Sequence, residues 1–460
     1  HMNPTHNLYS KLPSIKQIDE YMAQKSLPFG KEIRNQVNQV LKNIRQDKEY
    51  LESENLTRPD ILYRIESELK TRSNLMISVI NGTGAIIHTN LGRSVLSEAI
   101  FEEIKTLAST YTNLEFSLET GKRGTRLNSV GDLLKTLTVA EEAVVVNNNA
   151  AAVLLTLTAL AQSKEVIISR GELVEIGGSF RIPEVIAVSG AVLKEVGSTN
   201  RTRLDDYHKA ITDNTAVLLK AHTSNYEITG FTESVKTSQL AGLKAKTNTI
   251  LVEDIGSGAL ELFEHSQLNS DPLVPLVLKD GADIVTISGD KLIGGPQCGI
   301  ILGKKHLLDQ IKEHPLYRAL RCDKITMLLL EKTLIAYSRG QHRSQIPTQR
   351  MLNESDYQVK VRAKEILDKL PQQDCYRLVP CNSTPGGGSL PGKKIKSWGI
   401  ELHSNHHSEG KIMDLLRSQS PPVIGRIQNN KVVLDCRTIL PQQMNQVSEI
   451  LKKIELELLG

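Results

Sequence analysis

One strand and the turn after it limit what this chain can fold into. Residues 282–287 (ADIVTI) form an apolar, β-branched run that is typical of a buried strand, and residues 288–297 (SGDKLIGGPQ) follow directly. Glycines and a proline end the strand there, so Lys291 lies at its carboxyl end. Open α/β sheets bind ligands at that end of their strands. The pattern therefore predicts an α/β fold with a ligand site that includes Lys291.

Lys291 has two interpretations. Apolar surroundings disfavour the ammonium form, which leaves a neutral amine able to bond covalently to the aldehyde of pyridoxal phosphate (PLP). The alternative is a solvated lysine in a glycine-rich turn, and an SGDK motif by itself would favour it. Features elsewhere in the chain favour the cofactor.

Two further strand ends carry residues that suit a PLP site. After the apolar run 143–146, residues 147–152 (NNNAAA) begin a helix, where asparagine caps the end and small alanines let a phosphate approach the backbone N–H groups. Asp254 follows the expected strand 249–253, and its carboxylate can keep a pyridine nitrogen protonated. Ordinary capping, or a magnesium ligand at Asp254, would explain each feature separately. An Asn-rich turn, Asp and Lys at successive strand ends together predict PLP fold type I.

The spacing of apolar residues divides the chain into three parts. Residues up to about 75 show helical spacing, and from residue 141 strands and helices alternate until a smaller α+β pattern begins near 341. We therefore expect a helical domain over 1–80, a large PLP-binding α/β domain with a mixed, mostly parallel sheet over 81–340, and a small α+β domain over 341–460. Further strands are expected at 165–169, 185–188, 215–221, 299–302 and 431–435.

Arginine-rich segments are candidate anion sites, because guanidinium matches phosphate geometry. Arg93 follows a glycine- and asparagine-rich segment that also holds His88, and Arg126 ends the loop GKRGTR. Arg318 and Arg321 are three residues apart in a helix expected to continue through Leu334, so they could close on one anion. Surface loops, a solvated basic face and a structural histidine are the alternatives. Residues 386–388 (GGG) are interpreted as a turn, since no Lys-Ser/Thr pair follows.

Composition bounds the partners. A net charge of +4 over 460 residues permits an RNA partner without requiring one. The five cysteines form no CxxC pair, which suits a reducing cytoplasm and argues against a disulfide scaffold or a zinc site. No apolar run reaches membrane-spanning length. We therefore expect a cytoplasmic protein with no metal and no DNA or membrane partner.

These segments together resemble the bacterial selenocysteine synthase family, the L-seryl-tRNA(Sec) selenium transferases. The matching segments span nearly the whole chain: 81–93, 121–126, 147–151, 253–258, 288–297, 317–324 and 422–426. The resemblance implies that Lys291 binds PLP covalently, that Asp254 faces its pyridine nitrogen, and that the other cofactor contacts come from Asn149, Ala150, Ala151 and Ser288. It further implies a selenophosphate pocket formed by Arg93, Arg318 and Arg321, with Arg126 and Asp290 nearby.

The resemblance also implies a reaction. L-seryl-tRNA(Sec) would become L-selenocysteinyl-tRNA(Sec) through an aminoacrylyl-tRNA intermediate, with selenophosphate as donor and the freed Lys291 as general base. A homo-oligomeric ring of five dimers would form, and the helical domain would grip the tRNA. Two alternatives stay open: a PLP-dependent β-lyase or aminotransferase acting on a small amino acid, and a PLP-free RNA-binding or regulatory relative.

Overall fold

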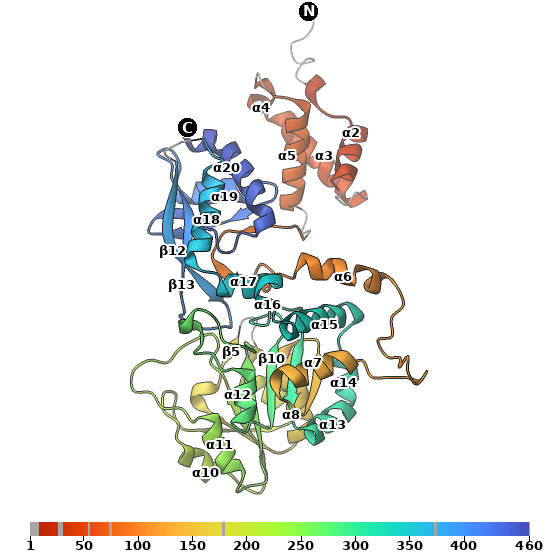
Figure 1. The fold of residues 1–460 in the computed structure, drawn as a ribbon. Helices are drawn as coiled ribbons and strands as arrows, with labels where there is room; N and C mark the ends of the chain where they lie inside the picture. The colour runs from red at the N-terminus through yellow and green to blue at the C-terminus, as the bar shows by residue number, and fades with distance from the viewer. Residues whose placement is uncertain are drawn as a thin grey trace, which may run out of the picture.

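The computed structural model describes residues 9–25, 31–53, 56–72, 76–176, 180–371 and 375–459. The C-terminal sheet with its own helices lies above the central α/β layers in Figure 1, and the helices at the N-terminal end lie beside it at the top. Within the described residues, no helix is both long enough and apolar enough to cross a membrane.

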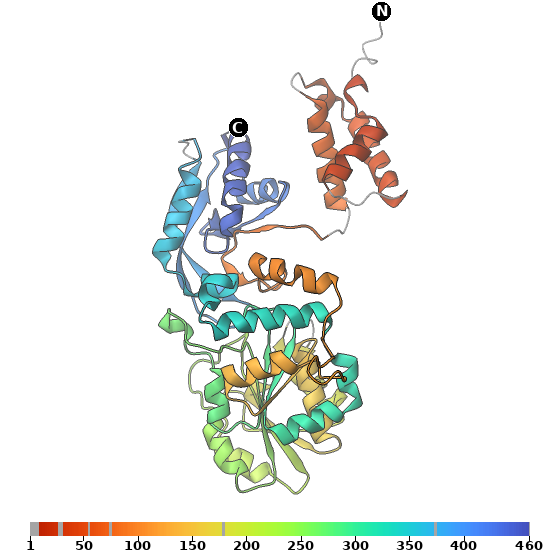
Figure 2. The ribbon, with the colours of Figure 1, turned by 45° about the vertical axis from the view of Figure 1, so that its right-hand side comes forward.

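The N-terminal helices build a core of their own. After the short η1 (Tyr9–Lys11), they are α2 (Ile15–Gln24), α3 (Lys31–Gln46), α4 (Lys48–Glu52) and α5 (Arg58–Arg72). Their buried residues form one cluster that contains no residue beyond Leu69, so the helical spacing in the sequence corresponds to an independent apolar core. Turning the molecule shows these helices standing apart from the central layers (Figure 2). The Lys453 ammonium lies 3.9 Å from the ring centre of Tyr63, which links this core to the C-terminal part.

A mostly parallel sheet forms the centre. In the described part of the chain its strands lie in the order β3 (Glu142–Val146), β11 (Gly299–Gly303), β10 (Ile284–Ser288), β9 (Ile250–Gly256), β8 (Thr215–Ala221), β4 (Glu165–Ser169) and β7 (Val192–Val196). Strand β11 runs antiparallel to both of its neighbours, and the β10–β9–β8–β4–β7 pairs are parallel. The predicted fold class, with a mixed and mostly parallel sheet, is confirmed.

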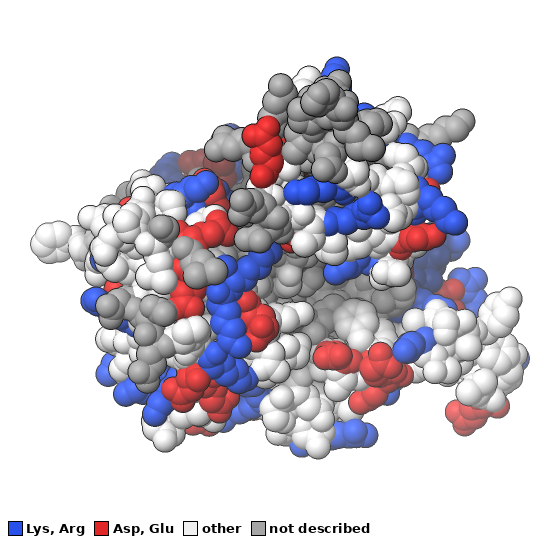
Figure 3. All heavy atoms as spheres, turned by 90° about the horizontal axis from the view of Figure 1, so that it is seen from above, with Lys and Arg blue, Asp and Glu red and all other residues white. Residues whose placement is uncertain are grey.

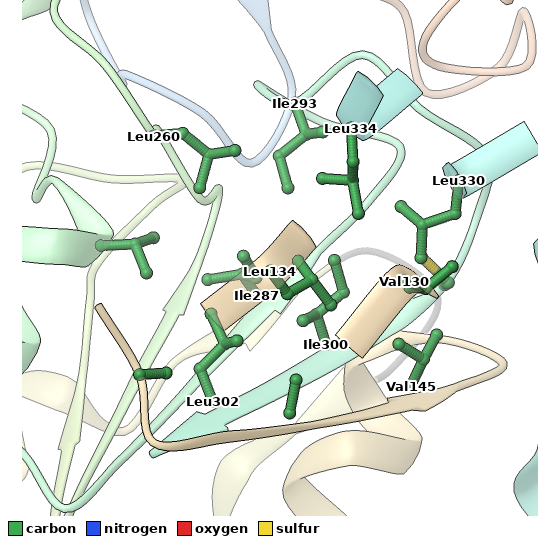
Figure 4. Packing of buried hydrophobic residues seen from close by; sticks show 14 of the residues in the cluster. Val130, Leu134, Val145, Leu260, Ile287, Ile293, Ile300, Leu302, Leu330 and Leu334 are labelled. Carbon is green, nitrogen blue, oxygen red and sulfur yellow. The ribbon is translucent and has the colours of Figure 1, made fainter. Parts of the chain in front are cut away.

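Helices cover both faces of this sheet because its strands are apolar on both sides. On one face, α7 (Asn128–Thr138), α12 (Val274–Lys279) and α15 (Lys324–Ser338) pack their leucines and valines against Val145 and Ile287 (Figure 4). On the other face, α8 (Asn149–Ala161), α9 (Ile182–Val188) and α13 (Lys305–Glu313) pack against Val144 and Val146. Helices α10 (Leu204–Ala210) and α11 (Thr237–Lys244) contribute to a third cluster around Leu218.

The C-terminal sheet includes a strand from the start of the α/β part of the chain. Its strands in the described residues lie in the order β15 (Arg426–Gln428), β16 (Lys431–Asp435), β13 (Ile395–Leu402), β12 (Tyr376–Gly386) and β2 (Ala85–Ile87). Strand β2 pairs parallel with β12, and β1 (Ile80–Asn81) pairs with β14 (Val423–Ile424). Helices α18 (Asp356–Leu367), α19 (Glu409–Arg417) and α20 (Met444–Leu459) pack on this sheet. The domain limits at residues 81 and 341 stay a prediction.

The remaining helices and strands connect these layers. They are α6 (Glu98–Ser109), α14 (Pro315–Leu320), α16 (His342–Gln345), α17 (Pro347–Asn353), the pair β5 (Glu175–Ile176) and β6 (Phe180–Arg181), and the 3-10 turns η2 (Arg170–Glu172), η3 (Ser266–Leu268) and η4 (Pro441–Gln443).

Two predictions of local structure were wrong. Residues 185–188, expected as a strand, belong to α9, which has a proline in its first turn and buries Ile182 and Ile186, one helical turn apart. The helix expected to run through Arg321 is interrupted, because Asp323 caps a new helix by accepting hydrogen bonds from the Ile325 and Thr326 N–H groups. Arg321 is extended (φ −69°, ψ 148°), so it shares no helical face with Arg318.

Candidate active site

Lys291 lies just beyond β10, at the carboxyl end of the strand, as the sequence predicted. Its side chain is buried, with 7% of the residue exposed, and Nζ donates a hydrogen bond to the Gly388 carbonyl at 3.1 Å. Burial lowers the pKa of Lys291, and the charge of Asp254 opposes this shift. The site therefore holds an amine whose neutral form is favoured.

Asp254 lies near the end of the neighbouring strand β9 and is 5% exposed. Its Oδ1 accepts hydrogen bonds from Asn149 Nδ2 and Thr286 Oγ1, both at 2.9 Å. Burial raises the pKa of Asp254, while the Asn149 and Thr286 hydrogen bonds and the charge of Lys291 act against the rise. The carboxylate is thus held in a fixed orientation where water cannot stabilise it.

Asn149, Asp254 and Lys291 surround one point. Gly256 has φ +70°, and a Cβ placed there would lie 3.8 Å from Lys291 Nζ, 3.9 Å from Asn149 Nδ2 and 4.0 Å from Asp254 Oδ1. Asn149 Oδ1 is buried and has no hydrogen-bond partner among the described residues. A buried acceptor without a partner calls for an explanation, and a bound ligand supplies one.

The N-terminus of α8 borders the same point. Asn148 caps the helix by accepting the Ala151 N–H at 2.8 Å, as the asparagine-rich turn predicted. Asn149 and Ala150 are the first two residues of the helix, so their N–H groups have no acceptor within it. These donors, together with the helix dipole, favour an anion at this end.

Asp290 joins Ser288 and Arg93 beside Lys291. Ser288 Oγ donates to Asp290 Oδ1 at 2.8 Å, and Arg93 Nη1 donates to Asp290 Oδ2 at 3.1 Å. Asp290 is buried, whereas Arg93 is partly exposed and adopts a left-handed backbone (φ +62°). The arginine therefore carries its charge to the rim of the lysine site.

Arg126 and Arg321 meet elsewhere, in a cavity of about 590 Å³ that we call the Glu115 cavity. Arg126 Nε and Arg321 Nη1 donate to Glu115 Oε1 at 3.0 and 3.4 Å, and Arg123 Nη2 lies 3.7 Å from Oε2. The Arg126 hydrogen bond and the nearby arginine charges lower the pKa of Glu115. The other lining residues are Gly124, Thr125, Leu127, Gly131, Asp132, Lys135, Glu142, Lys312 and Tyr317.

The structure brings together only some of the four arginines that the sequence analysis assigned to one pocket. Arg126 and Arg321 come together, and Arg93 lies with Asp290 and Lys291. Arg318 is exposed on α14 and does not line the Glu115 cavity. His88 Nδ1 accepts the Asn90 N–H at 3.2 Å, so its ring stabilises a local turn.

Sequence reasoning missed several polar groups around the lysine. Thr286 holds Asp254, and the Gly388 carbonyl holds Lys291. The backbone N–H of His222 donates to the backbone carbonyl of Asp254 at 2.8 Å, and the ring Nε2 of His222 lies 3.0 Å from Asp271 Oδ1. The position of His222 just after β8 was a usable signal, because neighbouring parallel strands end on the same side of the sheet. Gly388 offered no such signal, since its contact is made by a backbone atom from a distant segment.

Known proteins resemble this chain along nearly its whole length. Residues 79–440 match the family model described as L-seryl-tRNA selenium transferase. The L-seryl-tRNA(Sec) selenium transferase of Alkaliphilus oremlandii is 44% identical, with 97% of this chain and 98% of the relative covered. The enzyme of the same name from Carboxydothermus hydrogenoformans is 46% identical over 82% of this chain and 81% of its own.

A solved structure supports the fold separately. D-glucosaminate-6-phosphate ammonia-lyase superposes with a TM-score of 0.59 at 20% identity, covering 83% of this chain and 97% of that one. At this identity the likeness concerns the fold alone. The family match and the level of identity to its members decide the assignment, as the resemblance in the sequence had indicated. The chain belongs to the L-seryl-tRNA(Sec) selenium transferase family.

Proposed function

We propose that the chain performs its family's reaction with PLP bound at Lys291 and selenophosphate as the selenium donor, converting L-seryl-tRNA(Sec) to L-selenocysteinyl-tRNA(Sec). The observation that carries this proposal is the meeting of Lys291, Asp254 and Asn149 around Gly256, at the carboxyl ends of β10, β9 and β3. An amine, a carboxylate and an amide with an unused oxygen form a donor set that suits a pyridine aldehyde with a phosphate.

The residues present fit PLP. Lys291 would be the covalent attachment point, and Asp254 would pair with the ring nitrogen. The free N–H groups of Asn149 and Ala150 would hold the phosphate at the start of α8, where Ala151, assigned with them, donates its own N–H to Asn148. Ser288 supports the site through Asp290, to which its hydroxyl donates. When bound, the cofactor supplies an electron sink for charge that develops at the substrate Cα.

Lys291 also moves the proton in this proposal. Seryl-tRNA has a free α-amine because its carboxyl group is esterified, and this amine would take the place of Lys291. The released lysine would then take the proton from the seryl Cα, a role that its lowered pKa favours. The serine hydroxyl would leave Cβ as water, and selenium would then bond to Cβ while a proton returns to Cα. The bond between selenium and phosphorus would break, with water taking the phosphoryl group as phosphate.

An anionic donor needs cations. We assign Arg93, Arg126, Arg318 and Arg321 to selenophosphate, with Asp290 orienting Arg93. The Glu115 cavity supports Arg126 and Arg321, because its lining has more bases than acids. Besides these two arginines it holds Arg123, Lys135 and Lys312, against the acids Glu115, Asp132 and Glu142. Arg93 is supported by its place beside Lys291, and Arg318 rests on the family resemblance.

The N-terminal helices are proposed to dock the tRNA. Lys42 and Arg45 are exposed on α3, opposite the buried Val37 and Val40. Seen from this end of the molecule, basic and acidic residues are interspersed (Figure 3), so contact with RNA would depend on shape as well as charge. A homo-oligomeric ring of five dimers and a cytoplasmic location complete the proposal. Lys31, at the start of α3, and Lys48, at the start of α4, have side chains outside the described residues.

The test uses the purified full chain. With PLP added, a near-visible absorbance band that borohydride bleaches, and a reduced adduct mapped to Lys291 by mass spectrometry, would support the cofactor site. The same protein should retain tRNA(Sec) over an elongator tRNA of similar length, less so as salt rises.

A chain starting at residue 76 discriminates the alternatives. It should keep the absorbance band and lose most of its affinity for tRNA(Sec). Tight tRNA binding by this truncated chain would show the helices to be structural. A full chain with the band but no preference for tRNA(Sec) would favour a β-lyase or aminotransferase, and absence of the band would favour a PLP-free relative.

A further inference from the structure

The turn after β12 reaches Lys291 from the C-terminal sheet. Strand β12 lies beside β2, with Gly386 opposite Ile87. It ends at Gly386, and the turn continues with Gly387, Gly388 and Ser389. Lys291 Nζ donates to the Gly388 carbonyl at 3.1 Å. A Cβ at Gly388 would lie 2.7 Å from Nζ and 3.2 Å from Cε, so a larger residue there would push the lysine amine away from the carbonyl.

This turn is costly to form. Gly386 and Gly388 have φ of +115° and +72°, and Leu390, which has a Cβ, has φ +50°. Ser389 is 1% exposed, and its hydroxyl has no hydrogen-bond partner among the described residues. Left-handed backbone and an unpaired buried hydroxyl destabilise a fold and tend to persist at functional sites. The backbone geometry of this turn therefore does not serve stability. The contact between the turn and Lys291 is the feature that could account for it.

We propose that the Gly388 carbonyl is a positioning group that holds Lys291 Nζ whenever the lysine is not covalently bound. This inference rests on the proposed function, in which Lys291 is released when the substrate amine takes its place. A released lysine has to stay within reach of the seryl Cα to remove its proton. The Gly388 carbonyl supplies a fixed acceptor without adding a charge to the site.

The C-terminal sheet reaches the lysine along two adjacent strands. Strand β12 leads to Gly388, and β2 leads to the segment that ends in Arg93. The acceptor of Lys291 and its neighbouring cation therefore both come from strands of one sheet.

Other charges around Lys291 come from different elements. Asp254 lies on β9, Asp290 directly precedes the lysine, Arg93 follows β2, and Asp271 lies in the segment after β9. The Gly388 carbonyl is neutral, so its effect is separable from theirs. Loss of a hydrogen bond to the ammonium form should lower the pKa of Lys291 by about one unit, a tenfold change in the fraction of neutral amine.

The test compares Gly388→Ala with Gly340→Ala in the full chain. Gly340 also has a left-handed backbone (φ +66°), but a Cβ there meets nothing within 4 Å, so it controls for backbone strain alone. Cofactor-free protein is labelled with acetic anhydride across a pH series, and mass spectrometry gives the pH at which half of Lys291 is modified. We expect this pH to fall by about one unit in Gly388→Ala and to stay at the wild-type value in Gly340→Ala.

A second pair of variants covers a failure of Gly388→Ala to fold. Ser389→Gly frees the backbone next to the carbonyl, and Ser389→Ala removes the same hydroxyl without freeing it. A downward shift of the half-labelling pH in Ser389→Gly alone would support the proposal. A wild-type half-labelling pH in a folded Gly388→Ala would overturn the proposal. If Gly388→Ala melts far below Gly340→Ala, a wild-type half-labelling pH in Ser389→Gly would overturn it instead. Because labelling needs no cofactor, this result is independent of whether PLP binds to Lys291.

Discussion

Two sites with charged groups behave in opposite ways in this protein. Around Lys291, burial determines the protonation states: the pKa of the lysine is lowered and that of Asp254 is raised, each toward its neutral form. In the Glu115 cavity, the Glu115 side chain is 31% exposed, and its arginine partners lower its pKa toward the charged form. Proton transfer requires the first environment, while holding an anion requires the second.

The largest effect is expected at the lysine. Lys291→Ala should abolish selenocysteinyl-tRNA formation and the borohydride-sensitive absorbance band, because both the attachment point and the general base are lost. Circular dichroism and tRNA(Sec) binding should be retained. Lys305→Ala, which changes an exposed lysine on α13, serves as the control. Wild-type turnover in Lys291→Ala would show that Lys291 is not the group that transfers the proton, and that the lysine site and the Glu115 cavity do not differ in this role.

Asp254→Asn should reduce turnover about 10²- to 10³-fold, the usual cost of removing one preorganised electrostatic group. The amide keeps the shape of the carboxylate but cannot stabilise a protonated ring nitrogen. Steady-state kinetics and the absorbance spectrum in the presence of PLP measure the effect. Turnover within a factor of two of wild type would show that this carboxylate only supports the fold.

Arg126→Ala and Arg321→Ala should each weaken selenophosphate binding by about 1.5–3 kcal/mol, roughly ten- to a hundredfold. The removal of the seryl hydroxyl should be less affected, which a single-turnover assay without donor can measure. Arg339→Ala, an exposed arginine after α15, is the control. An unchanged apparent donor affinity in both variants would make the Glu115 cavity a structural ion-pair cluster.

The smallest effect concerns Glu115 and stability. A carboxylate whose folded-state pKa is lowered stabilises the fold above its unfolded pKa, and this stabilisation is lost as the pH falls through the folded value. Glu115→Gln should therefore lower the melting temperature more at pH 7 than at pH 3. Partial exposure limits the effect to less than about 1 kcal/mol. An equal loss at both pH values would mean that packing, not charge, holds this side chain.

Local sequence was enough to predict the elements that carry the lysine and the carboxylate. The apolar, β-branched runs before Lys291 and Asp254 form β10 and β9, and the asparagine-rich turn caps α8. These predictions succeeded because a buried strand or a helix cap depends on residues adjacent in the chain. The strand predicted at 185–188 was wrong because those four residues were read without Ile182 and Pro183, where the helix begins.

Tertiary structure decided which of these residues meet. The sequence indicated arginines suited to an anion, but the cap formed by Asp323 separates Arg321 from Arg318 and leaves Arg321 bonded to Glu115. Likewise, the glycines at 386–388 were recognised as a turn, and only the pairing of β12 with β2 brings the Gly388 carbonyl to Lys291. Contacts between segments about a hundred or more residues apart depend on how sheets pack and pair, and a backbone acceptor has no side chain to mark it in the sequence.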